Sequence, residues 1–236
     1  PVWMKKRLEL VGLRPINNVV DISNYIMHEL GQPLHTFDYD KIKGAKMILR
    51  ESKNGEIIKT LDGKTHALNG GDIVIEDGKG RLIDLAGIMG GENSAVDQNT
   101  KNVLLFVQTY NPINIRKTSM SLAVKTEAAV IFERDLDPEL VSLGISRGIE
   151  LFTKLTGGKC KKLILDLYPT PYKTKKVQID ISFIEQMLGI KISKKEISKI
   201  LKLLNFETHW NKNIVDILIP SFRSKDINIP EDLIEE

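Results

Sequence analysis

Three stretches of the chain place apolar residues at helical spacing. Residues 3–11 and 22–30 predict two helices. Asp21 or Ser23 is expected to cap the second helix, and Gly31 is expected to end it. A third helix is predicted before residues 157–158, because one face of that segment is apolar. Its apolar face consists of Val141, Ile145, Ile149, Phe152 and Leu155. Its expected cap is Asp137.

Short apolar runs bounded by turn residues predict β-strands at residues 57–61, 65–68, 73–75, 82–85 and 103–107. The first two flank Asp62-Gly63, a hairpin signal, and the next two flank a turn at residues 77–80. The last run is almost continuously apolar, as in a buried strand. Hairpins interrupted by helices predict an α+β fold that is mixed and largely antiparallel.

A change of composition near residue 168 predicts two domains. Residues 168–176 combine prolines with a basic polar run and read as a linker, so we expect domains at 1–168 and 173–236. The second has capping-box patterns beginning at Ser182 and Ser193. With the strands predicted after them, these helices indicate a small helix-turn-helix-like or winged-helix-like α/β module. The final residues read as the first turn of a helix, so we expect a fragment truncated at that end.

Composition narrows the classes of function. The 34 Lys and Arg residues are nearly balanced by 31 Asp and Glu residues, which leaves a net charge of +3 and favours no DNA partner. The single cysteine excludes an internal disulfide and suggests the cytoplasm, and no apolar run is long enough for a membrane span. GxxxxGK[ST], GxSxG and HExxH motifs are absent, and no metal site is expected.

One run, RPINNVVDISNYIMHELGQPLHTFD at residues 14–38, carries polar groups that a core would not select. It ends in a rigid polar loop, residues 32–35, that delivers His35. Further motifs follow in order at residues 61–63, 86–92, 102–105, 125–128, 132–134 and 136–138. Together these motifs closely resemble the editing domain of the β subunit of bacterial phenylalanyl-tRNA synthetase, and the C-terminal region resembles the module that follows it.

The resemblance implies hydrolysis of tyrosine wrongly esterified to tRNA(Phe), and it supplies a set of site residues. The catalytic positions would be His35, Ser23, Asn24 and Thr126, and the substrate-binding positions would be Arg14, Gly90, Phe106 and Ala128. Three of these residues have a structural alternative when taken singly. His35 could be a satisfied loop histidine, Gly90 part of a tight turn, and Thr126 a helix N-cap.

Phe106 departs from the family, which has a glutamate there that accepts the hydroxyl of tyrosine. A phenyl ring cannot accept a hydrogen bond, so weakened selectivity for tyrosine is expected, and Phe106 could equally be a core residue on a buried strand. Gln108, two residues on, is a less favoured replacement acceptor. The alternative function is an editing-deficient module that positions tRNA and packs subunits.

The resemblance also implies features of a complete enzyme. Phenylalanine–tRNA ligation would need an α₂β₂ assembly with the α subunit and tRNA(Phe), and ATP and Mg²⁺ would bind in the partner subunit. This chain lacks the ATP-binding motifs of class II synthetases, so the fragment would hold the editing site, need no cofactor, and lack the ligase site. A free-standing nucleic-acid-binding protein is the least favoured reading, because the charge is so small.

Overall fold

The computed structural model describes residues 1–161 and 164–236. Contacts divide the chain into two compact units, Pro1–Ile164 and Leu165–Glu236, and each is described by itself. Residues 162 and 163, which fall in the range predicted for the first domain, lie outside the described residues. Among the described residues, no helix is long and apolar enough to cross a membrane.

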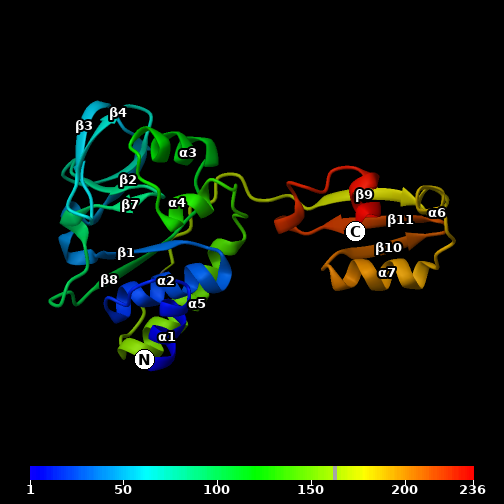
Figure 1. Ribbon diagram of the computed structural model, residues 1–236, viewed down its shortest axis with the longest axis horizontal. Coiled ribbons are helices and arrows are strands. Elements are labelled where there is room, and N and C mark those ends of the chain that lie inside the picture. Colours follow the sequence, from blue (N-terminus) through cyan, green and yellow to red (C-terminus); the bar gives the residue numbers. More distant parts are fainter. Residues whose placement is uncertain (162–163) are drawn as a thin grey trace. The chain divides into compact units, whose positions relative to one another are not determined.

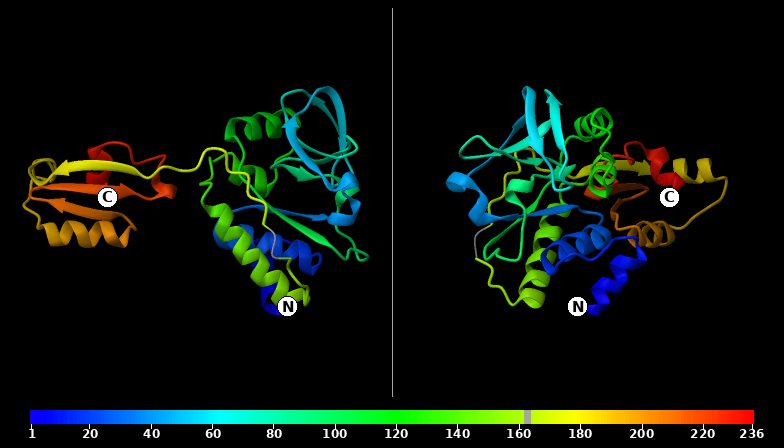
Figure 2. Two further views of the ribbon diagram at one scale, coloured as in Figure 1. Left: turned by 180° about the vertical axis from the view of Figure 1, so that it is seen from behind. Right: turned by 60° about the vertical axis from the view of Figure 1, so that its left-hand side comes forward.

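The centre of the first unit is an antiparallel ribbon of two strands, β1 (Leu34–Asp38) and β8 (Val103–Val107). Figure 1 shows this ribbon between a layer of helices and the remaining strands, and Figure 2 shows the same layering from behind. The helices on one side are α1 (Val2–Leu10), α2 (Asn18–Leu30) and α5 (Leu140–Thr156).

Hydrophobic side chains pack on both faces of the ribbon, which explains the continuous apolar run at residues 103–107. Successive side chains of a strand point to opposite faces. Leu34 and Leu105 therefore pack with the helices in one hydrophobic core, whereas Phe37 and Phe106 pack with the β-strands in another. Gly148 of α5 lets the helix approach closely, since a Cβ there would lie 2.5 Å from Leu105 Cδ2.

The β-strand layer contains the two predicted hairpins. The hairpin around Gly63 is β3 (Asn54–Lys59) with β4 (Thr65–Asn69), and β5 (Ile73–Asp77) pairs with β6 (Leu82–Leu85). Both predictions are confirmed, and every strand pair described is antiparallel, as the predicted fold class requires. The larger sheet has the order β2-β5-β6-β7, with β2 at Met47–Glu51 and β7 at Met89–Gly90.

Helix starts differ from the predictions. Asn17 caps α2 by accepting from Val20 N at 2.9 Å, so neither Asp21 nor Ser23 is the cap. The chain becomes helical earlier than predicted, and Asp21 instead accepts from Ile16 N at 2.7 Å. Gly31 ends the helix with a φ of 70°, as predicted.

The start of α5 is also corrected. Asp137 lies in the turn before this helix, where its carboxylate accepts from Glu139 N at 3.0 Å. Glu139 occupies the N-cap position itself and makes no side-chain cap bond. The helical pattern was predicted correctly, but the position of its first turn was not.

Several elements were not predicted. Residues 32–35 were expected to form a loop, yet Leu34 and His35 belong to β1. Pairing with β8, a long-range contact, converts this stretch into a strand. Other elements that the sequence pattern did not reveal are β2, β7, α3 (Pro112–Ser121) and α4 (Glu127–Phe132).

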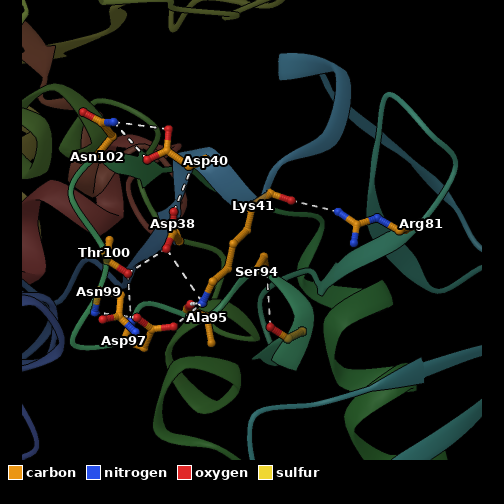
Figure 3. A network of polar contacts seen from close by, with 11 residues as sticks. Asp38, Asp40, Lys41, Arg81, Ser94, Ala95, Asp97, Asn99, Thr100 and Asn102 are labelled. Atoms are coloured by element: carbon orange, nitrogen blue, oxygen red, sulfur yellow. Dashed lines mark hydrogen bonds and ion pairs between the residues drawn. The ribbon is translucent and has the colours of Figure 1, made fainter.

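A polar network holds the end of the ribbon that lies away from His35 (Figure 3). Thr100 Oγ1 donates to the buried carboxylate of Asp38 at 2.7 Å, and Lys41 Nζ reaches Asp97 at 2.7 Å. Asn102 donates to Asp40 at 2.9 Å. The segment after β1 is thereby tied to the loop before β8, which supports the register of the two strands.

The second unit is a three-stranded antiparallel sheet with helices. The sheet order is β10-β11-β9, and two helices separate β9 from the hairpin formed by the other two strands. Its elements are β9 (Lys175–Asp180), α6 (Ile181–Leu188), α7 (Lys194–Leu203), β10 (Glu207–Asn211), β11 (Ile214–Ile219) and α8 (Pro230–Glu235).

This unit confirms the predicted pair of helices followed by a hairpin, with two corrections. β9 begins within the stretch that was assigned to the linker. The cap of α6 is Asp180, whose carboxylate accepts from Ser182 N at 2.8 Å, rather than Ser182 itself. Ser193 does cap α7, accepting from Glu196 N at 3.2 Å.

Replacement of Gly91 by alanine should destabilise the strand layer. A Cβ at this position would lie 2.7 Å from Ile83 O, a backbone atom that cannot rotate away. We expect Gly91→Ala to lower the free energy of unfolding by about 1–3 kcal/mol, the usual effect of overpacking. Denaturant unfolding of the chain measures this.

The matched control is Gly158→Ala, where the nearest atom is a side-chain oxygen, Thr156 Oγ1, at 3.0 Å. We expect a change within about 0.5 kcal/mol for this variant. Equal stability of the two variants would contradict the close packing of β6 on the turn at Gly91.

Candidate functional site

His35 lies in strand β1, directly opposite Phe106 of β8. Its ring packs edge-to-face on Phe37, with 4.5 Å between the ring centroids. The ring also occupies the space where a side chain at position 90 would be, because a Cβ on Gly90 would lie 2.5 Å from His35 Cε1 and 2.6 Å from Nε2. His35 is therefore a strand residue held between two layers, and only glycine fits at position 90 without moving it.

The imidazole of His35 is neutral at physiological pH. Burial lowers its pKa from 6.5 to about 4, because a charged ring would lose its hydration. Within the described residues the ring makes an aromatic contact and no hydrogen bond or ion pair. A neutral ring nitrogen of this kind can accept a hydrogen bond from water.

Thr126 and Ala128 approach the site from the start of α4. The Thr126 hydroxyl accepts from Ala129 N at 3.1 Å and donates to Ile88 O at 2.9 Å. Thr126 is thus a helix N-cap that also ties α4 to the strand segment leading into Gly90. Ala128 is partly buried and packs against the β core. One turn therefore carries both residues next to the strand that contacts His35.

The helix α2 contributes Asn24 from another direction. His28, one turn after Asn24 and on the same helix face, has its Nε2 3.8 Å from Glu127 Oε2 at the start of α4. The face that carries Asn24 is therefore directed toward the turn of Thr126. Asn24 is partly exposed, and no hydrogen bond is described for its side chain within residues 1–161 and 164–236.

Two predicted residues have surroundings that fit the site less directly. Ser23 is buried, and its hydroxyl donates to Val19 O at 3.2 Å inside its own helix. Arg14 is exposed on the segment before α2, without a hydrogen bond or ion pair in the described part of the chain. The structure brings together Gly90, His35 and Phe106, with Thr126 bonded beside them.

Phe106 is a core residue as well as a neighbour of His35. Its ring makes an edge contact with Phe37 at 5.9 Å between centroids, and it packs against the β core. Gln108 lies beyond the end of β8, so the strand alternation that suggested it as an acceptor does not extend to it. Its backbone oxygen accepts from Gln32 Nε2 at 2.9 Å.

Asp84 is a titratable residue of this region that sequence reasoning missed. It lies on β6 directly opposite Gly90, and only 3% of its surface is exposed. Burial raises the pKa of its carboxyl group to about 8, so the group is protonated at pH 7. The sequence feature that could have revealed Asp84 is an acidic residue inside the apolar run Leu-Ile-Asp-Leu at residues 82–85. No group of three or more potential metal ligands was found among the described residues.

Comparison with known proteins gives the family. A model of the B3/4 domain matches residues 1–157, and a model of the tRNA synthetase B5 domain matches residues 177–236. The phenylalanine–tRNA ligase β subunits of Clostridium acetobutylicum and Geobacter sulfurreducens are each 39% identical to the chain over its whole length. The chain belongs to the phenylalanine–tRNA ligase β-subunit family.

The chain spans only part of these relatives. It covers 30% of the Clostridium acetobutylicum subunit and 29% of that from Geobacter sulfurreducens. A solved N-terminal fragment of the phenylalanyl-tRNA synthetase β subunit from Pyrococcus horikoshii aligns with 92% of this chain and 63% of its own, with a TM-score of 0.46 and 17% identity. The family assignment rests on the domain models and the sequence relatives.

Replacement of Asp84 by asparagine should stabilise the protein at neutral pH. The unfolded carboxyl group has a pKa near 3.8 and the folded one about 8, so between these values the unfolded state loses a proton that the folded state keeps. Stability is therefore lost as the pH rises through this window, by up to about 4 kcal/mol at pH 7. We expect Asp84→Asn to recover much of this, as measured by denaturant unfolding.

The pH dependence separates this effect from a simple packing change. The advantage of Asp84→Asn should shrink toward zero near pH 3, where the carboxyl group of the wild type is largely protonated in both states. Glu9→Gln, an exposed carboxyl-to-amide change on α1, is the control and should show no such trend. A variant as stable as the wild type at both pH values would show that Asp84 is not held protonated.

Proposed function

We propose that the first unit is a proofreading hydrolase that removes tyrosine misattached to tRNA(Phe). The observation that carries this is the placement of the neutral His35 ring over Gly90 and opposite Phe106, with the Thr126–Ala128 turn bonded to the strand beside it. Polar groups and apolar side chains therefore lie together at one place. An aminoacyl ester with an aromatic side chain needs both kinds of contact.

Hydrolysis of the ester needs little catalytic assistance from the protein, because an aminoacyl ester is already activated. A water molecule attacks the carbonyl carbon, the bond to the ribose oxygen breaks, and that oxygen takes up the proton that the water has lost. With a pKa of about 4, His35 is a weak base, and its main contribution is to orient the water through a ring nitrogen. Asn24 and Thr126 would hydrogen-bond the substrate, and Arg14 and Ser23 keep the substrate-binding and catalytic roles, respectively, that the resemblance implies.

The remaining features of the enzyme follow from the family. We infer that the chain acts within a cytoplasmic α₂β₂ phenylalanine–tRNA ligase, bound to the α subunit and tRNA(Phe). ATP and Mg²⁺ would serve ligation in the partner subunit. The motifs for that reaction are absent from this chain, so its own contribution would be the editing site.

A second candidate function is a module that no longer edits and serves tRNA positioning and subunit packing. The observation that favours it is the position of Phe106, whose ring is packed against Phe37 and the β core where the family has a hydroxyl-accepting glutamate. A filled pocket would exclude the tyrosyl side chain.

Deacylation of preformed tyrosyl-tRNA(Phe) by the complete synthetase distinguishes the two functions. We expect the wild type to release tyrosine and His35→Ala to reduce the rate by about 10²-fold or more, the usual contribution of a group that positions or deprotonates water. His209→Ala, which removes an exposed histidine of β10 in the second unit, is the control and should keep the full rate.

The variant Phe106→Glu tests the second candidate. If the wild type is inactive and this variant hydrolyses the ester, the loss of the glutamate has disabled editing. If neither hydrolyses it, the module is not an editing site in this protein.

A further inference from the structure

Asp84 is a buried acid whose surroundings leave it without a partner. Its residue is 3% exposed, and no hydrogen bond or ion pair to it is described within residues 1–161 and 164–236. A buried polar group without a partner costs about 1–3 kcal/mol, so most are hydrogen-bonded. The hydrolysis described above does not use this carboxyl group.

The fold directs Asp84 toward the candidate site. Directly opposed residues of antiparallel strands project their side chains from the same face. Asp84 is directly opposite Gly90, so its carboxyl group leaves the sheet on the face where the His35 ring covers Gly90. The carboxyl group and the imidazole therefore border one region, although they belong to different sheets.

Two more unsatisfied polar groups lie in this neighbourhood. Burial raises the pKa of the Tyr110 phenol, the nearby Asp84 carboxyl raises it further, and the adjacent Gln108 side chain lowers it. The Tyr110 hydroxyl oxygen and Gln108 Oε1 are both buried, and neither has a hydrogen-bond partner in the described part of the chain. Several buried polar atoms that lack partners at one place indicate a polar ligand atom that would pair with them.

We propose that Asp84, supported by Tyr110 and Gln108, recognises the para-hydroxyl group of the tyrosyl substrate. This inference rests on the proposed editing function. The substrate hydroxyl donates to a carboxyl oxygen of Asp84, and the neighbouring polar atoms supply the remaining partners. The acceptor that Phe106 cannot provide from β8 is thus provided from β6, while the ring of Phe106 remains part of the apolar wall.

Selectivity for tyrosine over phenylalanine follows from the burial of the Asp84 carboxyl group. A phenylalanyl group in this site would leave the buried carboxyl group unpaired, whereas a tyrosyl group would satisfy it. Sites that hydrogen-bond a substrate hydroxyl reject the analogue that lacks it by as much as about 10⁴–10⁵-fold. The carboxyl group is therefore kept in a costly position because it distinguishes the two amino acids.

The test compares hydrolysis of tyrosyl-tRNA(Phe) and phenylalanyl-tRNA(Phe) by the complete synthetase. In the wild type we expect kcat/KM to favour the tyrosyl ester. Asp84→Leu, which keeps the branching at Cγ and removes the acceptor, should reduce this preference at least tenfold, mainly through slower hydrolysis of the tyrosyl ester. Adding Phe106→Glu to Asp84→Leu should restore the preference.

A binding measurement keeps the inference separate from catalysis. The synthetic site is first occupied by a non-hydrolysable phenylalanyl adenylate, and amide-linked tyrosyl- and phenylalanyl-adenosine are then titrated by calorimetry. Tighter binding of the tyrosyl analogue that disappears in Asp84→Leu supports hydroxyl recognition even if neither ester is hydrolysed, an outcome in which only the editing function fails.

Two results would overturn the inference. One is equal treatment of both amino acids by the wild type, and the other is an unchanged preference in Asp84→Leu, in which case the carboxyl group holds only water. Should Asp84→Leu fail to fold, Tyr110→Phe replaces it. This variant should lower the preference for tyrosine by several-fold, and an unchanged preference counts against the proposal.

Discussion

The pairing of β1 with β8 is the contact on which the first unit depends. The ribbon separates two hydrophobic cores, so its register decides which side chain enters which core. A slip by one residue would turn His35 toward the helices and Leu34 toward the candidate site. Both ends resist such a slip. The polar network around Asp38 holds one end, and the bond from Gln32 to the backbone of Gln108 holds the other.

Small residues allow the layers around this ribbon to close. Gly148 admits Leu105 on the helical side, and Gly90 admits the ring of His35 on the side of the strands. The consequence of close packing is electrostatic as well as steric. The same burial lowers the pKa of His35 and raises that of Asp84, since it disfavours the charged form of each group. The region is therefore polar and uncharged at neutral pH, which suits recognition of a neutral phenol better than recognition of an ion.

Phe106 illustrates how one side chain can serve the core and limit the site at once. Its contact with Phe37 strengthens the β core, and its ring offers no hydrogen-bond acceptor opposite His35. A hydrogen-bond acceptor that one strand does not provide can come only from a group that reaches the same space from another strand. Asp84 meets that condition through its strand partner Gly90.

The sequence by itself determined the local features of this protein. The stripe at residues 141–155, the hairpin turns at Gly63 and Gly80, and the helix exit at Gly31 depend on neighbouring residues, and all were predicted. The ordered motifs also identified the family. The tertiary structure alone decided that residues 34–38 form a strand, because their partner is distant in the chain. It alone placed Asp84 opposite Gly90, since that proximity depends on strand pairing, which no local pattern encodes.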